Sequence, residues 1–276
     1  MKILKRILKG LLILVLLLPT SIFSQNQEQG FVKVKTMHWN MNLADFSMQD
    51  WKALELDYFN KITMKNEHIL SATVLQHHFT GDSSEILFIT VFSSWNDIDL
   101  AIQRTEELME ATWPNEDDRK AFLKKQAKFY AKAHSDEIYK SIPGTNRIEH
   151  TDLPLLYYVR TSHYTFPEDG SKEEFQSLLN EYNEVVTNNN EFYKGYYPQM
   201  HYYGSDRTEF LEVFCAETLA GLEKGIAKQG ELFRDHWADE KAQDGYNDKY
   251  GRYLTGIHSD RILSSVPDLY KPMPQD

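Results

Sequence analysis

The chain repeats itself at a fixed offset, and this repeat constrains its fold more than any other feature. Residues 134–143 resemble residues 258–267, and the same offset of 124 pairs Trp113 with Trp237. Between positions 47 and 143, 22 of 97 residues are identical to the residue 124 positions further on, without a gap. A period of this length indicates a duplicated domain rather than a solenoid of short repeats.

The repeat predicts two related halves, residues 25–150 and residues 151–276. Turn-forming residues, Pro143-Gly144-Thr145-Asn146, lie close to their junction. The whole chain has 276 residues, of which 41% are hydrophobic and 13% aromatic. That is enough for two small domains with a substantial core, and it excludes a disordered chain.

The first 24 residues have the pattern of a secretory signal peptide. Four cations, the last of them Lys9, precede an apolar run from Leu11 to Leu18, and Pro19 ends that run. The run is shorter than the roughly 20 residues of a membrane span. We therefore expect cleavage near Ser24 and an exported protein, periplasmic or secreted, without a stable membrane span; a retained anchor is the alternative.

Charge and cysteine usage exclude several classes of protein. The chain has 30 Lys and Arg against 41 Asp and Glu, a net charge of −11, and losing the four N-terminal cations would make it −15. An acidic chain of this kind does not predict binding to nucleic acid.

The lone Cys215 excludes an intrachain disulfide and a cysteine-based zinc site, and its apolar surroundings favour a buried hydrophobic role. No metal site is predicted.

Both halves show the same order of secondary structure. A run of β-branched and aromatic residues predicts a first strand. Apolar residues spaced three or four positions apart predict the helices, and a Gly-Asp-Ser or Gly-Ser-Asp turn predicts a hairpin. Ser47 and Ser171 are well placed as helix N-caps. The last element, near 138–142 and 262–266, is either a short strand or a capped turn. The expected ranges are 31–39, 47–63, 69–79, 85–92, 96–112 and 116–133 in the first half, and 155–164, 171–187, 196–203, 209–216, 217–235 and 239–255 in the second.

This β-α-β-β-α order is that of a ferredoxin-like unit, so the fold class is α+β. A duplicated unit with a long second helical region resembles the dimeric α/β-barrel superfamily. That superfamily includes antibiotic-biosynthesis-monooxygenase-like domains, haem-degrading monooxygenases and chlorite-dismutase-like proteins. The resemblance rests on element order and duplication and covers both halves. It implies an intramolecular barrel made by the two halves, and hence a monomer.

Alternation along the first strand of each half separates two faces. Val32, Val34 and His38 share one face, and Lys35 lies on the other, as Arg160 does in the second half. We expect the valine face to meet the helices. Lys35 and Arg160 would then point into the barrel. Glu212 would point the same way, because the alternation along its own strand places it on the side opposite to its apolar neighbours. Charged side chains exposed to solvent are the alternative.

The resemblance implies a ligand pocket between the sheet and the helices of one unit. Imidazoles can act there as bases or ligands, and indoles can form an aromatic wall. Each residue also has a structural interpretation, which is core packing for the tryptophans and a helix or turn cap for the repeated His-Ser-Asp motif. The candidate pocket residues are His38, His163, His77, His201, Trp113, Trp237, Lys35 and Arg160, and the candidate structural motif is His134, Asp136, His258 and Asp260.

Two functions remain open. Because no nucleotide-binding, zinc-protease or serine-hydrolase motif is found, no catalytic residues are assigned. The first hypothesis is an exported protein without a cofactor that binds a small, partly aromatic molecule or has a structural role. The second, motivated by the resemblance, is a cofactor-free or haem-dependent monooxygenase-like enzyme.

Overall fold

The computed structural model describes residues 30–148 and 151–274, so the expected signal peptide lies outside the described residues. Both halves run strand, helix, strand, strand, helix, helix, strand. The first half comprises β1 (Phe31–His38), α1 (Met48–Tyr58) with a π-helical turn (Phe59–Thr63), β2 (Ser71–Phe79), β3 (Glu85–Phe92), α2 (Trp95–Thr112), α3 (Glu116–Ala127) and β4 (Ser135–Ser141). The second comprises β5 (Leu156–Tyr164), α4 (Lys172–Val185) with a 3-10 turn (Thr187–Asn189), β6 (Gly195–Tyr203), β7 (Glu209–Ala216), α5 (Leu219–His236), α6 (Glu240–Gly251) and β8 (Leu254–Lys271).

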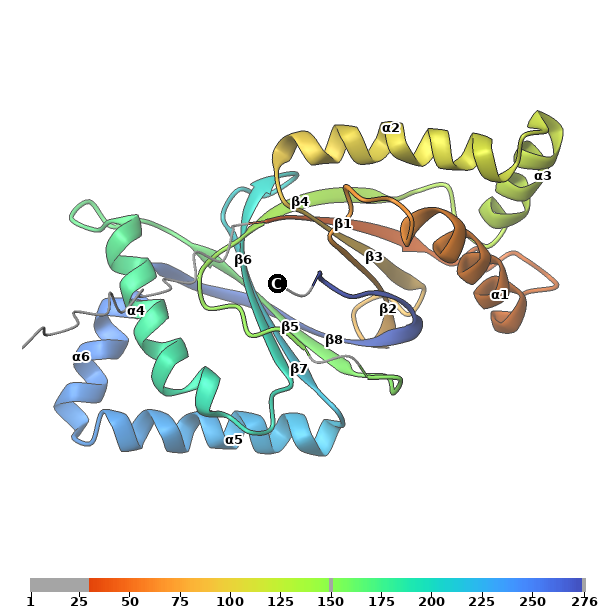
Figure 1. Ribbon diagram of the computed structural model, residues 1–276. Coiled ribbons are helices and arrows are strands. Elements are labelled where there is room, and N and C mark those ends of the chain that lie inside the picture. The colour runs from red at the N-terminus through yellow and green to blue at the C-terminus, as the bar shows by residue number, and fades with distance from the viewer. Residues whose placement is uncertain (1–29, 149–150, 275–276) are drawn as a thin grey trace, which may run out of the picture.

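The strands close into one antiparallel barrel in the order β1-β3-β2-β8-β5-β7-β6-β4 (Figure 1). The first half contributes β4-β1-β3-β2 and the second half β8-β5-β7-β6. The two sheets meet where β2 pairs with β8 and where β4 pairs with β6. The last element of each half is therefore a strand, and it joins that half to the other. The expected α+β barrel within one chain is what the structure shows.

Local sequence signals account for most element boundaries. Ser47 and Ser171 accept the backbone N–H groups of Asp50 and Glu174, so both predicted N-caps are confirmed. Both predicted hairpins are present, as β2–β3 and β6–β7. The third helix of each half is shorter than predicted, because the chain turns back to the sheet. After α3, for example, the backbone of Phe129 accepts a hydrogen bond from Asn40 N–H.

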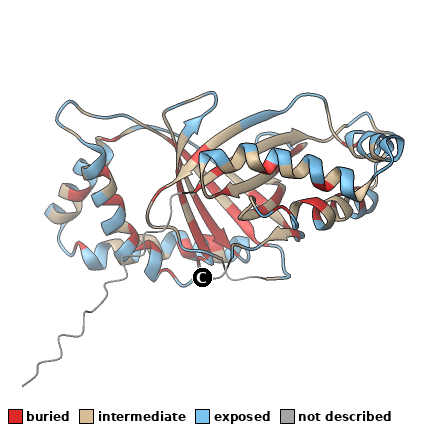
Figure 2. Cartoon of the chain, turned by 45° about the horizontal axis from the view of Figure 1, so that its top comes forward, coloured by how far each residue is buried: buried red, intermediate tan, exposed pale blue. Residues whose placement is uncertain are grey.

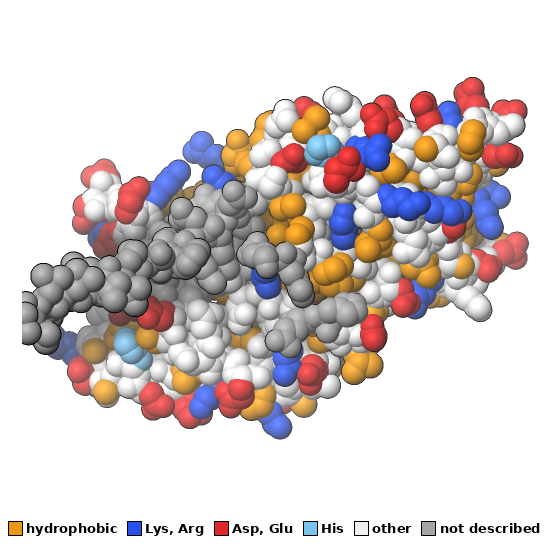
Figure 3. Space-filling model, in the orientation of Figure 1, with side chains coloured by type: hydrophobic (Ala, Val, Ile, Leu, Met, Phe, Trp, Pro, Cys, Tyr) orange, Lys and Arg blue, Asp and Glu red, His pale blue; other side chains and the backbone are white. Residues whose placement is uncertain are grey.

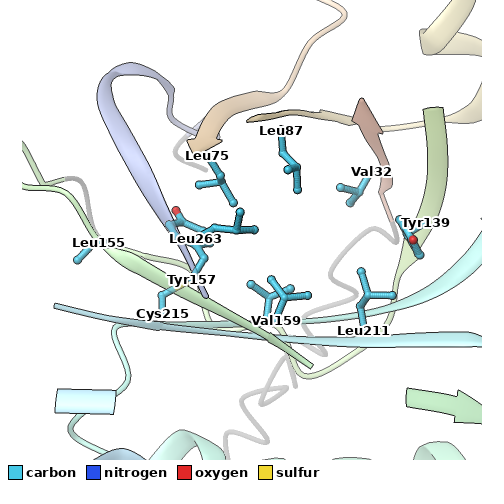
Figure 4. Close-up of a cluster of buried hydrophobic side chains, with 11 residues drawn as sticks. Val32, Leu75, Leu87, Tyr139, Leu155, Tyr157, Val159, Leu211, Cys215 and Leu263 are labelled. Atoms are coloured by element: carbon cyan, nitrogen blue, oxygen red, sulfur yellow. The ribbon is translucent and has the colours of Figure 1, made fainter. Parts of the chain in front are cut away.

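The barrel interior is apolar and is filled by side chains from both halves. Figure 2 shows the buried residues concentrated on the central strands, and Figure 4 shows eleven of these side chains converging from strands of both sheets. Val32 and Leu87 come from the first half, and Val159, Leu211 and Leu263 from the second. A barrel of eight strands is just wide enough for side chains to fill, so its interior takes β-branched and aliphatic residues.

This packing corrects the predicted strand faces. The face of β1 that carries Val32 and Val34 points into the barrel, not towards the helices. Arg160 and Glu212 lie on the outer face, against the helices of the second half, and Lys35 lies near Glu55 of α1. The prediction was wrong because a closed interior excludes water, and an unpaired cation there would lose its hydration.

Three helices cover the outer face of each sheet, α1–α3 in the first half and α4–α6 in the second (Figure 1). Among the residues of 30–148 and 151–274, no helix is long and apolar enough to cross a membrane. Figure 3 shows acidic and basic side chains interspersed over the helices on the visible side of the molecule, without a continuous basic face there.

Candidate functional site

The second half holds a cavity of about 500 Å³ between its sheet and its helices. The floor is formed by β5 and β7, the walls by α4, α5 and α6, and the rim by the beginning of β8. Ligand pockets for small organic molecules have volumes of about 300–1,000 Å³ and combine apolar walls with a few polar groups. By size and position this cavity is the candidate site.

Arg160 of β5 stands on the cavity floor in a hydrogen-bonded cluster. Its Nε donates to Asp260 Oδ1 at 3.1 Å, and its Nη2 donates to the hydroxyl of Tyr158 at 2.8 Å. The Tyr158 hydroxyl in turn donates to the same Asp260 oxygen at 2.8 Å. The positive charge of Arg160 is thus paired with Asp260, which reaches it from the neighbouring strand β8.

Glu212 of β7 is the second ionisable group on the floor. Its Oε1 accepts a hydrogen bond from the hydroxyl of Tyr196 at 2.9 Å, and no cation pairs with it among the described residues. Burial raises the pKa of Glu212 above its usual value, although the Tyr196 hydrogen bond and the charge of Arg160 act in the opposite direction. A carboxyl group with a perturbed pKa in a cavity is a recognised sign of a functional site.

Three tyrosines face Glu212 from the helices: Tyr182 of α4, and Tyr246 and Tyr250 of α6. The hydroxyl of Tyr246 donates to the backbone oxygen of Leu178 at 3.0 Å. The hydroxyls of Tyr182 and Tyr250 have no hydrogen-bond partner among the described residues. Burial, followed by the charge of Glu212, raises the pKa of Tyr182, and burial also raises the pKa of Tyr246 and Tyr250. All three are therefore neutral phenols.

The first half has a packed core in the corresponding place. Lys35 and Phe88 occupy the positions of Arg160 and Glu212 in the strand pairing. Phe88 packs into a cluster with Trp51 and other apolar residues. A buried carboxylate, Glu55, is held there by donors from two neighbours, at 2.9–3.0 Å from Gln126 Nε2 and 2.6 Å from the Tyr130 hydroxyl. The two halves thus differ at this site.

The sequence-predicted histidines His38 and His163 lie elsewhere. Both are on the valine face, so the expected helix-facing position was wrong. His38 Nδ1 lies 3.0 Å from Asp82 Oδ2, and His163 Nδ1 lies 3.1 Å from Asp206 Oδ2. Each aspartate sits in the hairpin turn of its own half. These pairs connect the end of the first strand to that turn.

His77 and His201 lie at the same end of the barrel, because every strand pairing is antiparallel and β1, β2, β5 and β6 therefore run in one direction. His77 Nδ1 lies 2.9 Å from the hydroxyl of Thr80. His201 Nε2 is buried, 3.7 Å from Glu137 Oε2. None of these histidines lines the cavity.

The two predicted tryptophans pack within their own halves. Trp113 stacks on Phe122, with ring centroids 4.3 Å apart. Trp237 lies 4.3 Å from the ring of Tyr246, directly behind one cavity wall. Of the candidate pocket residues, only Arg160 lines the cavity; Trp237 supports its wall.

The repeated His-Ser-Asp motif forms strand, not helix caps. Ser135 begins β4, and residues 258–260 lie within β8, so the capping interpretation was wrong. Asp136 pairs with Lys33 at 2.9 Å, and Asp260 holds Arg160 as described. The motif therefore supplies carboxylates that bind cations across the strand ladder. His258, at 3.3 Å from Asp260, also lines the cavity rim.

The sequence analysis identified Arg160 and placed Glu212 on the same side of the sheet, but it missed the tyrosines. Tyr246 and Tyr250 are four residues apart, and this spacing places both on one face of a helix. An aromatic pair on a predicted helix opposite two charged strand residues was the available signal.

The cavity residues do not fit haem. Haem iron is held by a histidine, cysteine, methionine or tyrosinate ligand. The only histidine among the described lining residues, His258, lies at the rim beside Asp260, and the raised pKa values of the three tyrosines disfavour tyrosinate. The described residues also contain no group of three His, Cys, Asp or Glu side chains that could hold a metal ion.

Comparison with known proteins identifies the fold. No family model and no curated protein matches the chain. Among solved structures, it is similar to a candidate monooxygenase from Fusobacterium nucleatum, with 12% identity, 86% of this chain and 93% of that chain covered, and a TM-score of 0.55. A candidate monooxygenase from Lactobacillus acidophilus shows 10% identity, coverage of 89% and 97%, and a TM-score of 0.52.

A chlorite dismutase from Candidatus Nitrospira defluvii, in complex with imidazole, is similar over 87% of this chain and 92% of its own, with 11% identity and a TM-score of 0.50. Together with the barrel topology, these likenesses show that the chain has the dimeric α/β-barrel fold. At such low identity they define the fold and leave the activity to the residues of the site.

Proposed function

We propose that the protein binds a small, partly aromatic molecule in the cavity of its second half. The observation that carries this proposal is the pair Arg160 and Glu212, two charged residues on a floor walled by aromatic rings within about 500 Å³. Placing an ionisable group such as Glu212 on the floor of a cavity lowers stability unless a ligand meets it, whereas in the first half Phe88 takes the corresponding position and packs among apolar side chains.

A cavity-blocking variant tests the proposal. Gly230 of α5 lines the cavity, and a side chain added there first meets the flexible end of Arg234, at 3.2 Å from its Cβ position. Gly230→Phe should therefore fill the cavity without breaking the fold. A matched control is Gly245→Phe on α6, where no atom lies within 4 Å of the added Cβ.

The measurement is a screen of small aromatic molecules by ligand-observed NMR against the purified protein. We expect hits with the wild type and with Gly245→Phe, and their loss with Gly230→Phe. Hits that persist in Gly230→Phe, or no hits at all, would contradict binding in this cavity.

A monooxygenase-like enzyme is the second candidate, and the raised pKa of Glu212 favours it. A carboxylate with a pKa nearer neutrality is a better general base, and this one adjoins the cavity. Oxygen uptake in the presence of each bound molecule, in wild type and in Glu212→Gln, tests this activity. Because the cavity lining does not fit haem, we expect no Soret shift when haem is added to the wild type; a shift that His258→Ala removes would contradict this.

We further propose that residues 1–24 direct export and that the exported protein is a monomer that arose by duplication. The n-region, the short apolar run and the matching order of elements in the two halves support this. The mass of the protein recovered outside the cytoplasm should correspond to a chain that begins near Gln25. Sedimentation should give one copy of the chain.

A further inference from the structure

We propose that the cavity recognises a cationic nitrogen, so that its ligand is an aromatic amine-bearing molecule whose protonated amino group meets Glu212. This inference rests on the proposed function and deepens it by naming the class of ligand. The juxtaposition behind it is a carboxylate that makes no ion pair among the described residues, on the floor of a cavity that phenol rings also line.

The distribution of charge on the floor favours a cation. Arg160 is already neutralised, because Asp260 pairs with its Nε and Tyr158 accepts from its Nη2. Glu212 has only the neutral Tyr196 hydroxyl on one of its oxygens. Arg160 lies opposite Glu212 in the strand ladder and its charge acts on the carboxylate, but among the described residues it makes no ion pair with it. The ionisable group on the floor that lacks an ion-pair partner is therefore Glu212, and a carboxylate held largely away from water is best satisfied by a charged donor.

The hydrogen-bond inventory also matches an ammonium group. A primary ammonium carries three donors and no acceptor. Around Glu212, the second carboxylate oxygen and the hydroxyls of Tyr182 and Tyr250 are without partners among the described residues. All three can accept, and all three belong to residues that line the same cavity, in which the charge of Glu212 raises the pKa of both tyrosines.

The walls supply faces for a cation and for an aromatic ring. Tyr182, Phe214 and Tyr250 line the cavity together with further aromatic residues, and ring faces attract cations. The other cations of the cavity lining, Arg234 of α5 and His258 of β8 when protonated, are exposed side chains at its edge. Water screens their charges, whereas Glu212 lies on the floor.

Three probes of similar shape test the inference: 2-phenylethylamine, 2-phenylethanol and 3-phenylpropanoate, measured by isothermal titration calorimetry. Wild type should bind the amine at least about 10-fold more tightly than the neutral or anionic probe. Glu212→Gln keeps the shape of the side chain and removes its charge. It should weaken amine binding about 10- to 100-fold and change binding of the alcohol by no more than about twofold.

Glu55→Gln is the matched control, because Glu55 is a buried carboxylate of the first half outside the cavity. It should leave binding of all three probes unchanged. Equal or tighter binding of the alcohol or the carboxylate by wild type overturns the inference, as does an amine preference that survives Glu212→Gln.

The screen described above separates the two failures. Suppose that the screen finds neutral or anionic ligands whose binding is abolished by Gly230→Phe, and that the amine does not bind. The cavity then binds small molecules, and the inference about the amine is wrong. If neither the screen nor the probes give binding that Gly230→Phe abolishes, the proposed function fails as well.

Discussion

Arg160 of β5 and Glu212 of β7 are direct partners in the antiparallel ladder, and both side chains line one cavity. In the first half, the corresponding partners are Lys35 and Phe88. Exchanging an aromatic ring for a carboxylate at one ladder position thus distinguishes the cavity-bearing half from the packed half. Replacing a large apolar side chain by a polar one is expected to open space and to cost stability.

The first prediction concerns the cost of burying Glu212. The pKa of Glu212 is raised in the folded protein from a usual value of 4.5, so folding favours its protonated form. Stability from this group is fully present below about pH 4.5 and is lost as pH rises through the folded-state pKa. Glu212→Gln should therefore be more stable than wild type at pH 8, by about 1.4 kcal/mol for each tenfold change in proton affinity.

Urea unfolding at pH 4 and at pH 8 measures this difference. The stabilising effect of Glu212→Gln should shrink towards zero at pH 4. If the difference in the free energy of unfolding were the same at pH 4 and pH 8, the Glu212 carboxyl would have the same pKa in the folded and unfolded protein, and the prediction would be wrong. The amide introduced by Glu212→Gln retains an oxygen that can accept from the Tyr196 hydroxyl, so that hydrogen bond is preserved.

The second prediction contrasts two glycines of α5. Gly225 is closely covered, and a Cβ there would lie 2.4 Å from Cε1 of Tyr193, whereas at Gly230 it meets only the end of Arg234 at 3.2 Å. Gly230→Ala should stabilise the protein by up to about 1 kcal/mol, because alanine is the better helix former. Gly225→Ala should destabilise it by about 1–3 kcal/mol, because the Tyr193 ring must move. Thermal unfolding of both variants measures the contrast, and equal effects would contradict it.

The third prediction concerns a contact between the halves. Arg261 of β8 donates from Nη1 to Glu85 Oε1 of β3 at 2.9 Å, and Glu85 is buried. Arg261→Met leaves this carboxylate without its cation and should cost about 1–3 kcal/mol. The double variant Arg261→Met with Glu85→Gln should recover part of that loss. Additive losses in a double-mutant cycle would show that the pair does not couple the halves.

The sequence was sufficient for most of the order of elements and for several local details, but it left open whether β4 and β8 are strands or capped turns. The repeat and the alternation of apolar residues predicted two halves with their hairpins, and the serine caps at 47 and 171 were confirmed. These features depend on contacts between near neighbours in the chain, which local patterns describe well.

The sequence was not sufficient for the direction in which the strands face. Alternation separates Val32 from Lys35 but does not say which side is interior, and the interior is chosen by closure of the barrel. Nor did it locate the cavity, because the lining comes from three helices and three strands, and local patterns do not say how such segments pack together.

The last prediction separates the barrel rim from the cavity. His38 and His163 each pair with an aspartate of a hairpin turn, and Asp82 and Asp206 have lowered pKa values, chiefly because Ser84 and Thr208 donate to them. Since the pairs are partly exposed, His38→Ala and His163→Ala should lower Tm by similar amounts, a few degrees at most, and less at high salt. Neither change should alter binding of any ligand found in the cavity. A selective loss of binding in either variant, measured by calorimetry at unchanged Tm, would assign that histidine to the site and contradict a purely structural role for the pair.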